Sequence, residues 1–213
     1  MSRRLPVYLL IDSSGSMAGE PIHSVNVGLR AMVSALRQDP FALESVSLAI
    51  TTFDVKVNDI LPMTPVAEVQ IADIEIPQSG ATHLGAGLEH IIAAVKRDVV
   101  HSTDEEKGDF RPMLFIMTDG SPSDTYAFNE ALPVLKTLNF AEIIACAAGP
   151  KAKTEALKLI TDNVVKLDNM DSTAFSKFFK WVSDSISAGS TSSAIEGDLS
   201  DKLPAPPAEI TFV

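Results

Sequence analysis

Hydroxyl and carboxylate side chains occur in three separate segments of the sequence, in a pattern typical of a divalent-metal site. The first segment, YLLIDSSGSM, carries the spacing D-x-S-x-S at Asp12, Ser14 and Ser16. Thr82 follows in SGATHLGAGL, and Asp119 lies in MLFIMTDGSPSD. Oxygen atoms of these types are hard ligands that suit Mg²⁺, Mn²⁺ or Ca²⁺. The sequence therefore predicts one metal site, provided that the fold brings the three segments together.

The positions of the segments support this interpretation. Two of them directly follow short apolar runs, at 5–11 and 113–117, which are typical of buried strands. In an α/β sheet, the carboxyl ends of such strands line the ligand crevice. Taken alone, Asp12 before S-S-G is ordinary turn chemistry, and Thr82 suits the N-cap of a helix that begins near Leu84. The joint occurrence of all five residues in order favours the metal site.

Strand-like and helix-like segments alternate along the chain, and this predicts an α/β fold. Apolar residues at steps of three and four predict a helix from Pro21 to just before Pro40. The other expected helices are 84–95, 126–138, 154–160 and 172–188, and the expected strands are 5–11, 46–53, 57–61, 113–117, 143–148 and 164–167. We expect a doubly wound, mostly parallel sheet with helices on both faces. Segment 57–61 is its one antiparallel edge strand.

The composition changes near Gly189, where the hydrophobic period stops. We therefore expect residues 1–188 to form one domain and 189–213 to form a flexible Ser/Pro-rich tail. The final residues, EITFV at 209–213, are β-prone. They can add a strand to a partner or to their own domain edge, or they can stay disordered.

Composition and charge exclude several classes of protein. The formal net charge of −11 argues against nucleic acid and against anionic membrane surfaces. The single cysteine, Cys146, excludes an intramolecular disulfide framework and a cysteine-based zinc site. The sequence contains neither a secretory h-region of about 7–15 apolar residues nor a transmembrane run of about 18 residues. A cytoplasmic location is the expectation that follows.

The spacing D-x-S-x-S, with a distant Thr and a distant Asp in a T-D-G turn, resembles the metal-ion-dependent adhesion site (MIDAS) of von Willebrand factor A (VWA) domains. All five motif positions are present here, and the resemblance spans roughly residues 5–188. The opening RRLPVYLLIDSSGSM and the segment GATHLGAGL are similar to TerY-like members of the family. Those members are bacterial proteins of tellurite-resistance and stress-response clusters.

The resemblance implies a Rossmann-like fold and a non-enzymatic role in protein–protein interaction, in which a partner's Asp or Glu completes the shell of a bound Mg²⁺ or Mn²⁺. In the family pattern Ser14, Ser16 and often Thr82 touch the ion, while Asp12 and Asp119 act largely through water. Similarity to the TerY-like proteins implies a protein kinase and a metal-dependent protein phosphatase as partners. Extracellular relatives couple binding to movement of the last helix, here 172–188.

An enzymatic alternative remains open at this stage. A haloacid-dehalogenase-like phosphohydrolase also places a nucleophilic Asp after its first strand, with Mg²⁺ nearby, which would be Asp12. Such enzymes need a second Asp two residues later, where this chain has Ser14, and no lysine lies close to either motif. The serine-hydrolase and P-loop patterns are absent from the sequence. Two interpretations stay open for five further side chains, a position at the rim of the site or an ordinary place on a solvated loop or helix face. These residues are Glu20, His23, Asp54, His83 and Asp124.

Overall fold

The computed structural model describes residues 3–77, 80–103, 105–190 and 203–213. Its strands form one seven-stranded sheet in the order β3-β2-β1-β4-β5-β6-β7. The pairs β1–β2, β1–β4, β4–β5 and β5–β6 are parallel, whereas β3 and β7 pair antiparallel at the two edges. The strands are β1 (Leu5–Asp12), β2 (Val46–Phe53), β3 (Val57–Pro65), β4 (Met113–Thr118), β5 (Glu142–Ala148), β6 (Val164–Leu167) and β7 (Ile210–Phe212).

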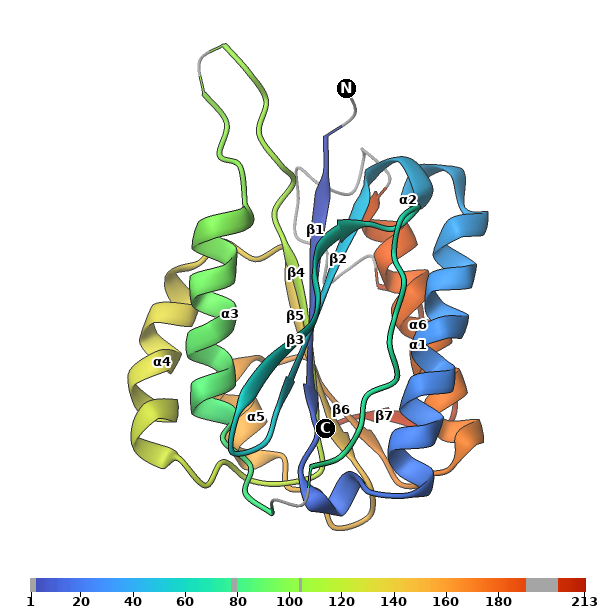
Figure 1. Cartoon of the computed structure of the whole chain (residues 1–213), viewed down its shortest axis with the longest axis vertical. Helices are drawn as coiled ribbons and strands as arrows, with labels where there is room; N and C mark the ends of the chain where they lie inside the picture. The colour runs from blue at the N-terminus through green and yellow to red at the C-terminus, as the bar shows by residue number, and fades with distance from the viewer. Residues whose placement is uncertain (1–2, 78–79, 104, 191–202) are drawn as a thin grey trace.

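Helices cover both faces of the sheet, with α1 and α6 packed together on one side and α3 beside α4 on the other (Figure 1). The predicted doubly wound, mostly parallel α/β fold is therefore confirmed. The helical elements are η1 (Gly15–Met17), α1 (Glu20–Gln38), α2 (Pro40–Ser45), α3 (Leu84–Asp98), α4 (Thr125–Thr137), α5 (Glu155–Ile160) and α6 (Ser172–Ser190).

Alternation along β1 explains why the sheet needs a helical layer on each face. Leu9 and Ile11 belong to the core beneath α1 and α6, whereas Tyr8 and Leu10 belong to the core beneath α3 and α4. Successive side chains of a strand point to opposite faces, so a strand that is apolar at every position must be covered twice. All eight residues of β1 are buried, and this places β1 in the centre of the sheet.

Three elements differ from the sequence-based expectation. One is β7, a second antiparallel edge strand where 57–61 was expected to be the only one. Pro40 ends the first predicted helix, but it also opens the short helix α2. The Asp39 side chain caps α2 by accepting hydrogen bonds from the amides of Phe41 and Ala42. Strand β3 continues past the predicted residue 61 to Pro65, because it follows β2 along most of its length with a register shift near Ile50.

The C-terminal strand β7 lies on β6, so EITFV adds to its own domain edge, one of the possibilities that the sequence left open. Ile210 is buried in the core beneath α1 and α6. The Trp181 indole Nε1–H in α6 donates to the Pro204 carbonyl at 2.8 Å. The boundary at residue 188 stays a prediction, because residues 191–202 of the proposed tail lie outside the described residues.

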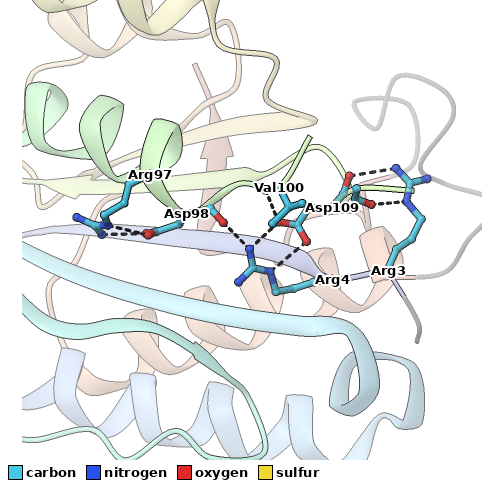
Figure 2. Close-up of polar contacts among 7 residues, drawn as sticks. Arg3, Arg4, Arg97, Asp98, Val100 and Asp109 are labelled. Atoms are coloured by element: carbon cyan, nitrogen blue, oxygen red, sulfur yellow. Dashed lines mark hydrogen bonds and ion pairs between the residues drawn. The ribbon is translucent and has the colours of Figure 1, made fainter. Parts of the chain in front are cut away.

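The segment between α3 and β4 projects beyond the sheet at the end where β1 begins (Figure 1). Two arginines hold its base, as Figure 2 shows. The Arg4 guanidinium donates to the Asp109 carboxylate at 2.6 and 3.1 Å, and the same carboxylate accepts from the Val100 amide at 2.8 Å. Arg3 donates to the carbonyls of Gly108 and Asp109 at 2.9 and 3.0 Å. The base of this segment therefore lies at the opposite end of β1 from Asp12.

Cys146 occupies the middle of β5, as the sequence predicted, and it is fully buried. Burial raises the pKa of its thiol well above the ordinary value, which keeps the thiol neutral. Within the ranges that the structure describes, no helix combines the length and apolar character needed to cross a membrane.

Gly28 in α1 should not tolerate a methyl group. A Cβ at this position would lie 2.2 Å from the ring of Phe179, which is buried in α6. Alanine favours a helix by about 1 kcal/mol over glycine, but overpacking a buried contact costs about 1–3 kcal/mol. We therefore predict that Gly28→Ala lowers the free energy of unfolding, measured as a lower urea midpoint. Gly80→Ala, where a Cβ meets nothing within 4 Å, is the control. Equal midpoints for Gly28→Ala and wild type would contradict the prediction.

Candidate metal site

The site begins with two neighbouring parallel strands that end side by side. Strands β1 and β4 are paired with Ile11 opposite Met117, and each strand ends one residue later, at Asp12 and Thr118. Asp119, which follows β4, therefore lies at the same end of the sheet as Asp12, the last residue of β1. The strand order reverses between β1 and β4, and α/β proteins commonly bind ligands at the carboxyl ends of the strands at such a switch point.

Four of the five predicted site residues are joined by a chain of hydrogen bonds. The Ser14 amide donates to Asp12 Oδ1 at 2.8 Å. The hydroxyls of Ser14 and Ser16 are 3.1 Å apart, and Ser16 Oγ donates to Asp119 Oδ1 at 2.9 Å. The structure thus brings the first and third sequence segments into direct contact. Asp12 and Ser14, at one end of this chain, are buried, whereas Ser16 is exposed and Asp119, at the other end, is half-buried.

Asp12 is the buried end of the chain, and both of its carboxylate oxygens accept hydrogen bonds. Besides the Ser14 amide on Oδ1, the Thr118 hydroxyl donates to Oδ2 at 2.5 Å. Burial raises the pKa of Asp12, and the nearby charge of Asp119 adds to this effect, while the bonds from Thr118 and Ser14 oppose it. A positive charge placed at the site would therefore stabilise the ionised form of Asp12.

Thr82 is brought to the site through the loop that follows Asp119. Its amide donates to Ser123 Oγ at 3.1 Å, and its carbonyl accepts from the Ser123 amide at 2.9 Å and from the Ser123 hydroxyl at 3.0 Å. The Thr82 hydroxyl lies over Gly120, where a Cβ would be 3.1 Å from Thr82 Oγ1. Glycine at 120 thus lets the Asp119 loop approach Thr82 closely. All three predicted segments therefore lie together at the carboxyl ends of β1 and β4.

Asp124, for which a place at the rim was one of two interpretations, has a structural role that the sequence did not reveal. It is the N-cap residue of α4, yet its carboxylate accepts hydrogen bonds from Gly85 and Ala86, at 3.0 and 2.8 Å, in the first turn of α3. Thr82 does not cap α3, because the N-cap position is His83. Asp124 therefore satisfies the exposed amides of a neighbouring helix and fixes the position of Thr82 relative to Asp119.

The remaining rim residues divide into exposed and buried positions. Glu20 and His23 are exposed in the first turn of α1. Asp54 is buried, and its carboxylate accepts from the Ser13 hydroxyl at 3.2 Å and from the Lys56 amide at 2.9 Å. The His83 amide donates to the Asp54 carbonyl at 2.9 Å, so the end of β2 is also tied to the start of α3. Sequence reasoning did not single out Thr118 or Ser123, although both lie within the motif segment 113–124.

The donor set fits a hard divalent cation. Adjacent oxygens around a six-coordinate Mg²⁺, with metal–oxygen distances of about 2.1 Å, are about 3 Å apart. The Ser14 and Ser16 hydroxyls, 3.1 Å apart, and Ser16 Oγ and Asp119 Oδ1, 2.9 Å apart, are held by hydrogen bonds at separations that neighbouring oxygens around one ion also have. Over the residues that the structure describes, no group of three or more His, Cys, Asp and Glu side chains is placed to hold a metal. The candidate site is instead rich in hydroxyls, which favours Mg²⁺, Mn²⁺ or Ca²⁺ over a softer ion.

Comparison with known proteins supports the fold. A family model described as von Willebrand factor type A domain matches residues 7–181. No curated protein matches the chain. A solved structure of proximal thread matrix protein 1 from the mussel byssus, with a zinc-occupied MIDAS motif, is similar at 15% identity and a TM-score of 0.61, covering 86% of this chain and 48% of that one.

Two further structures show the same fold. The ArnB paralog VWA2 from Sulfolobus acidocaldarius has 13% identity and a TM-score of 0.59, covering 84% of this chain and 45% of that one. The conserved hypothetical protein BatB from Bacteroides thetaiotaomicron has 14% identity and a TM-score of 0.54, covering 84% of this chain and 97% of that one. The chain thus spans about half the length of the mussel and Sulfolobus proteins.

Removing the carboxylate of Asp124 should weaken the attachment of the first turn of α3 to the start of α4. Asp124→Ala leaves the amides of Gly85 and Ala86 without their acceptor, and loss of such a cap costs about 1 kcal/mol. We predict a lower urea midpoint and faster hydrogen exchange at these two amides. Glu130→Ala, at an exposed position of α4, is the matched control. Unchanged exchange at Gly85 and Ala86 would show that Asp124 does not cap α3.

Proposed function

The chain belongs to the von Willebrand factor type A domain family, whose members are metal-binding modules of protein–protein interaction, and we propose that it binds a partner protein through a divalent cation. The residues proposed to hold the ion are the five predicted from the sequence, namely Asp12, Ser14, Ser16, Thr82 and Asp119. The observation that carries this proposal is the hydrogen-bonded chain from Asp12 through Ser14 and Ser16 to Asp119 at the carboxyl ends of β1 and β4.

The exposure of each residue assigns it a role. Ser16 is exposed and Asp119 is half-buried, so they form the outer side of the site, while Ser14 and Thr82 supply hydroxyls from below. Asp12 holds negative charge beneath them, with its two oxygens already engaged by the Ser14 amide and Thr118. The ion would supply a coordination position for an outside carboxylate. Because Ser16 is exposed and Asp119 half-buried, a partner's Asp or Glu would reach an ion held by these residues from the solvent side.

The finer proposals rest on similarity of sequence segments. Mg²⁺ or Mn²⁺ is the proposed ion, because hydroxyl and carboxylate oxygens suit hard cations. The opening RRLPVYLLIDSSGSM and the segment GATHLGAGL support membership among the TerY-like proteins. On that basis we place the protein in the bacterial cytoplasm, in a tellurite-resistance or stress pathway with a partner kinase and phosphatase. Binding of those partners only in the presence of the ion is the outcome expected from this assignment.

A binding role is favoured over phosphoryl transfer by the state of Asp12. A nucleophilic carboxylate must expose an oxygen to the substrate, but Asp12 has no exposed surface and both of its oxygens accept hydrogen bonds. The position two residues later, where a haloacid-dehalogenase-like enzyme needs its acid, is Ser14, whose hydroxyl contacts that of Ser16. We therefore propose a non-enzymatic module.

Metal should stabilise the folded protein against heat. A ligand at 100 times its Kd adds about 2.7 kcal/mol to the free energy of unfolding, which raises Tm by about 5–10 °C in a chain of this size. We predict such a shift for the wild type with millimolar Mg²⁺ or Mn²⁺, measured by differential scanning calorimetry. Removal of the ion with EDTA should reverse it.

Two variants test whether the ion that raises Tm binds at the predicted site. Asp119→Asn and Ser16→Ala should lose most of the shift while keeping the metal-free Tm, because both side chains lie on the outer side of the site. Ser121→Ala, an exposed serine of the same loop, should retain the shift. A full shift in Asp119→Asn would place the ion elsewhere, and the absence of any shift in wild type would remove the main support for the site.

The enzymatic alternative makes an opposite prediction about Asp12. Incubation with acetyl phosphate and Mg²⁺, followed by mass spectrometry of the intact chain, should show no added phosphoryl group, because the Asp12 oxygens are buried and hydrogen-bonded. A phosphoryl adduct that disappears in Asp12→Asn would establish the phosphohydrolase reading instead.

A further inference from the structure

A shallow groove adjoins the candidate metal site on its α4–α5 side. It has a volume of about 570 Å³ and lies between the first turns of α4 and the helix α5. The loop that carries Asp119 continues directly into it, since Ser121, Pro122 and Thr125 are lining residues. The groove and the site are therefore two parts of one surface at the carboxyl end of the sheet.

The chemistry of the groove differs from that of the site. Its floor and walls include Pro122, Phe128, Ala156 and Leu159. Leu159 is 53% exposed, whereas most leucines of this chain are buried in the two cores. The charged lining residues are one lysine and one glutamate, Lys153 and Glu155, so the groove carries no net charge in a chain of formal charge −11. An apolar side chain fits this environment better than a charged one, because a buried charge needs a partner.

The spacing between site and groove sets the shape of the occupant. Asp119 and Ser121 are two residues apart, so the Cα atoms of the site loop and of the polar rim of the groove are at most about 7 Å apart. The apolar lining, Phe128 and Leu159, comes from α4 and α5. In an extended peptide, side chains at alternate positions lie on the same face, with about 7 Å for every two residues. A single extended segment can therefore place a carboxylate at the site and an apolar side chain in the groove.

We propose that the partner presents an extended segment in which an Asp or Glu lies two or four residues from a large aliphatic or aromatic residue on the same face. The carboxylate binds at the site built around Asp119, and the apolar side chain packs against Leu159 and Phe128 in the groove. This proposal rests on the proposed function and deepens it, because it states what distinguishes the partner from other acidic proteins. A carboxylate alone would bind through the ion with little selectivity, whereas the groove adds a requirement for an apolar side chain close to the carboxylate.

Selection of random peptides tests the proposal with the full chain. A phage-displayed heptapeptide library is bound to the protein in Mg²⁺, and bound phage are eluted with EDTA and sequenced. The eluted pool should be rich in Asp and Glu. Large apolar residues two or four positions before or after the acid should be enriched about fivefold over the starting library, the change that partial burial of one such side chain supplies.

Three variants separate the groove from the site. Leu159→Ser should keep the enrichment of acidic residues and lose that of the apolar residue. Leu43→Ser, at a similarly exposed leucine (41% against 53%) on the short helix α2, should behave as wild type. Asp119→Asn should lose EDTA-eluted phage altogether.

Each failure has a separate meaning. An acidic pool without an apolar preference, or one whose preference survives Leu159→Ser, would overturn the groove proposal and leave the metal-dependent function intact. A pool with no EDTA-eluted acidic peptides from the wild type would overturn the proposed function, and the groove proposal with it.

Discussion

The parallel pairing of β1 with β4 is the constraint on which the candidate site depends. Because Ile11 lies opposite Met117, β1 and β4 end at the same level. Asp12 at the end of β1 and Thr118 at the end of β4 therefore lie close together. The Thr118 hydroxyl then bridges the two strand ends by donating to Asp12 at 2.5 Å. A slip of one residue in this register would turn Asp12 to the other face of the sheet. The apolar cores on both faces prevent that slip, so the folding energy of the sheet fixes the site.

A second group of contacts ties the loops around the strand ends to one another. Ser123 joins the loop after β4 to the backbone of Thr82, and Asp124 caps α3 from the start of α4. The Asp54 carbonyl accepts from the His83 amide, which adds the end of β2 to the same arrangement. These bonds are made within the protein and need no ligand. The five oxygen-bearing side chains are therefore positioned before any ion arrives, and this reduces the ordering that binding would require.

The strands and the motif were predictable because both depend on short stretches of sequence. Segments 46–53 and 164–167 were predicted with the bounds that β2 and β6 have, since runs of apolar residues specify buried strands. The joint occurrence of Asp12, Ser14, Ser16 and Asp119 predicted the contacts that the structure shows among them. Their metal role stays a prediction, because it concerns an ion and not the chain alone.

What the sequence did not reveal depends on contacts between distant residues. Asp124 stands where a residue would cap its own helix, yet its carboxylate reaches α3, because Gly85 allows the two helices to approach. A Cβ at Gly85 would lie 2.3 Å from the backbone nitrogen of Phe128. The capping pattern at the start of α4 does not predict a contact with α3, and Gly85 does not predict that Asp124 is its partner. Strand β7 is a similar case, since its place on β6 depends on an open edge that only the assembled sheet provides.

The gradient of exposure across the site explains why its chemistry suits binding. Charge is buried deepest at Asp12, where desolvation raises its pKa and two hydrogen bonds hold it in place. The outermost group, Ser16, is neutral and exposed, and Asp119 lies between them. A buried, immobilised carboxylate would attract a cation without offering a free oxygen for attack. A cation held there would lie beside the groove of Leu159 and Phe128, whose charged lining residues are one lysine and one glutamate, so the proposed partner segment would meet a charged and an apolar surface side by side.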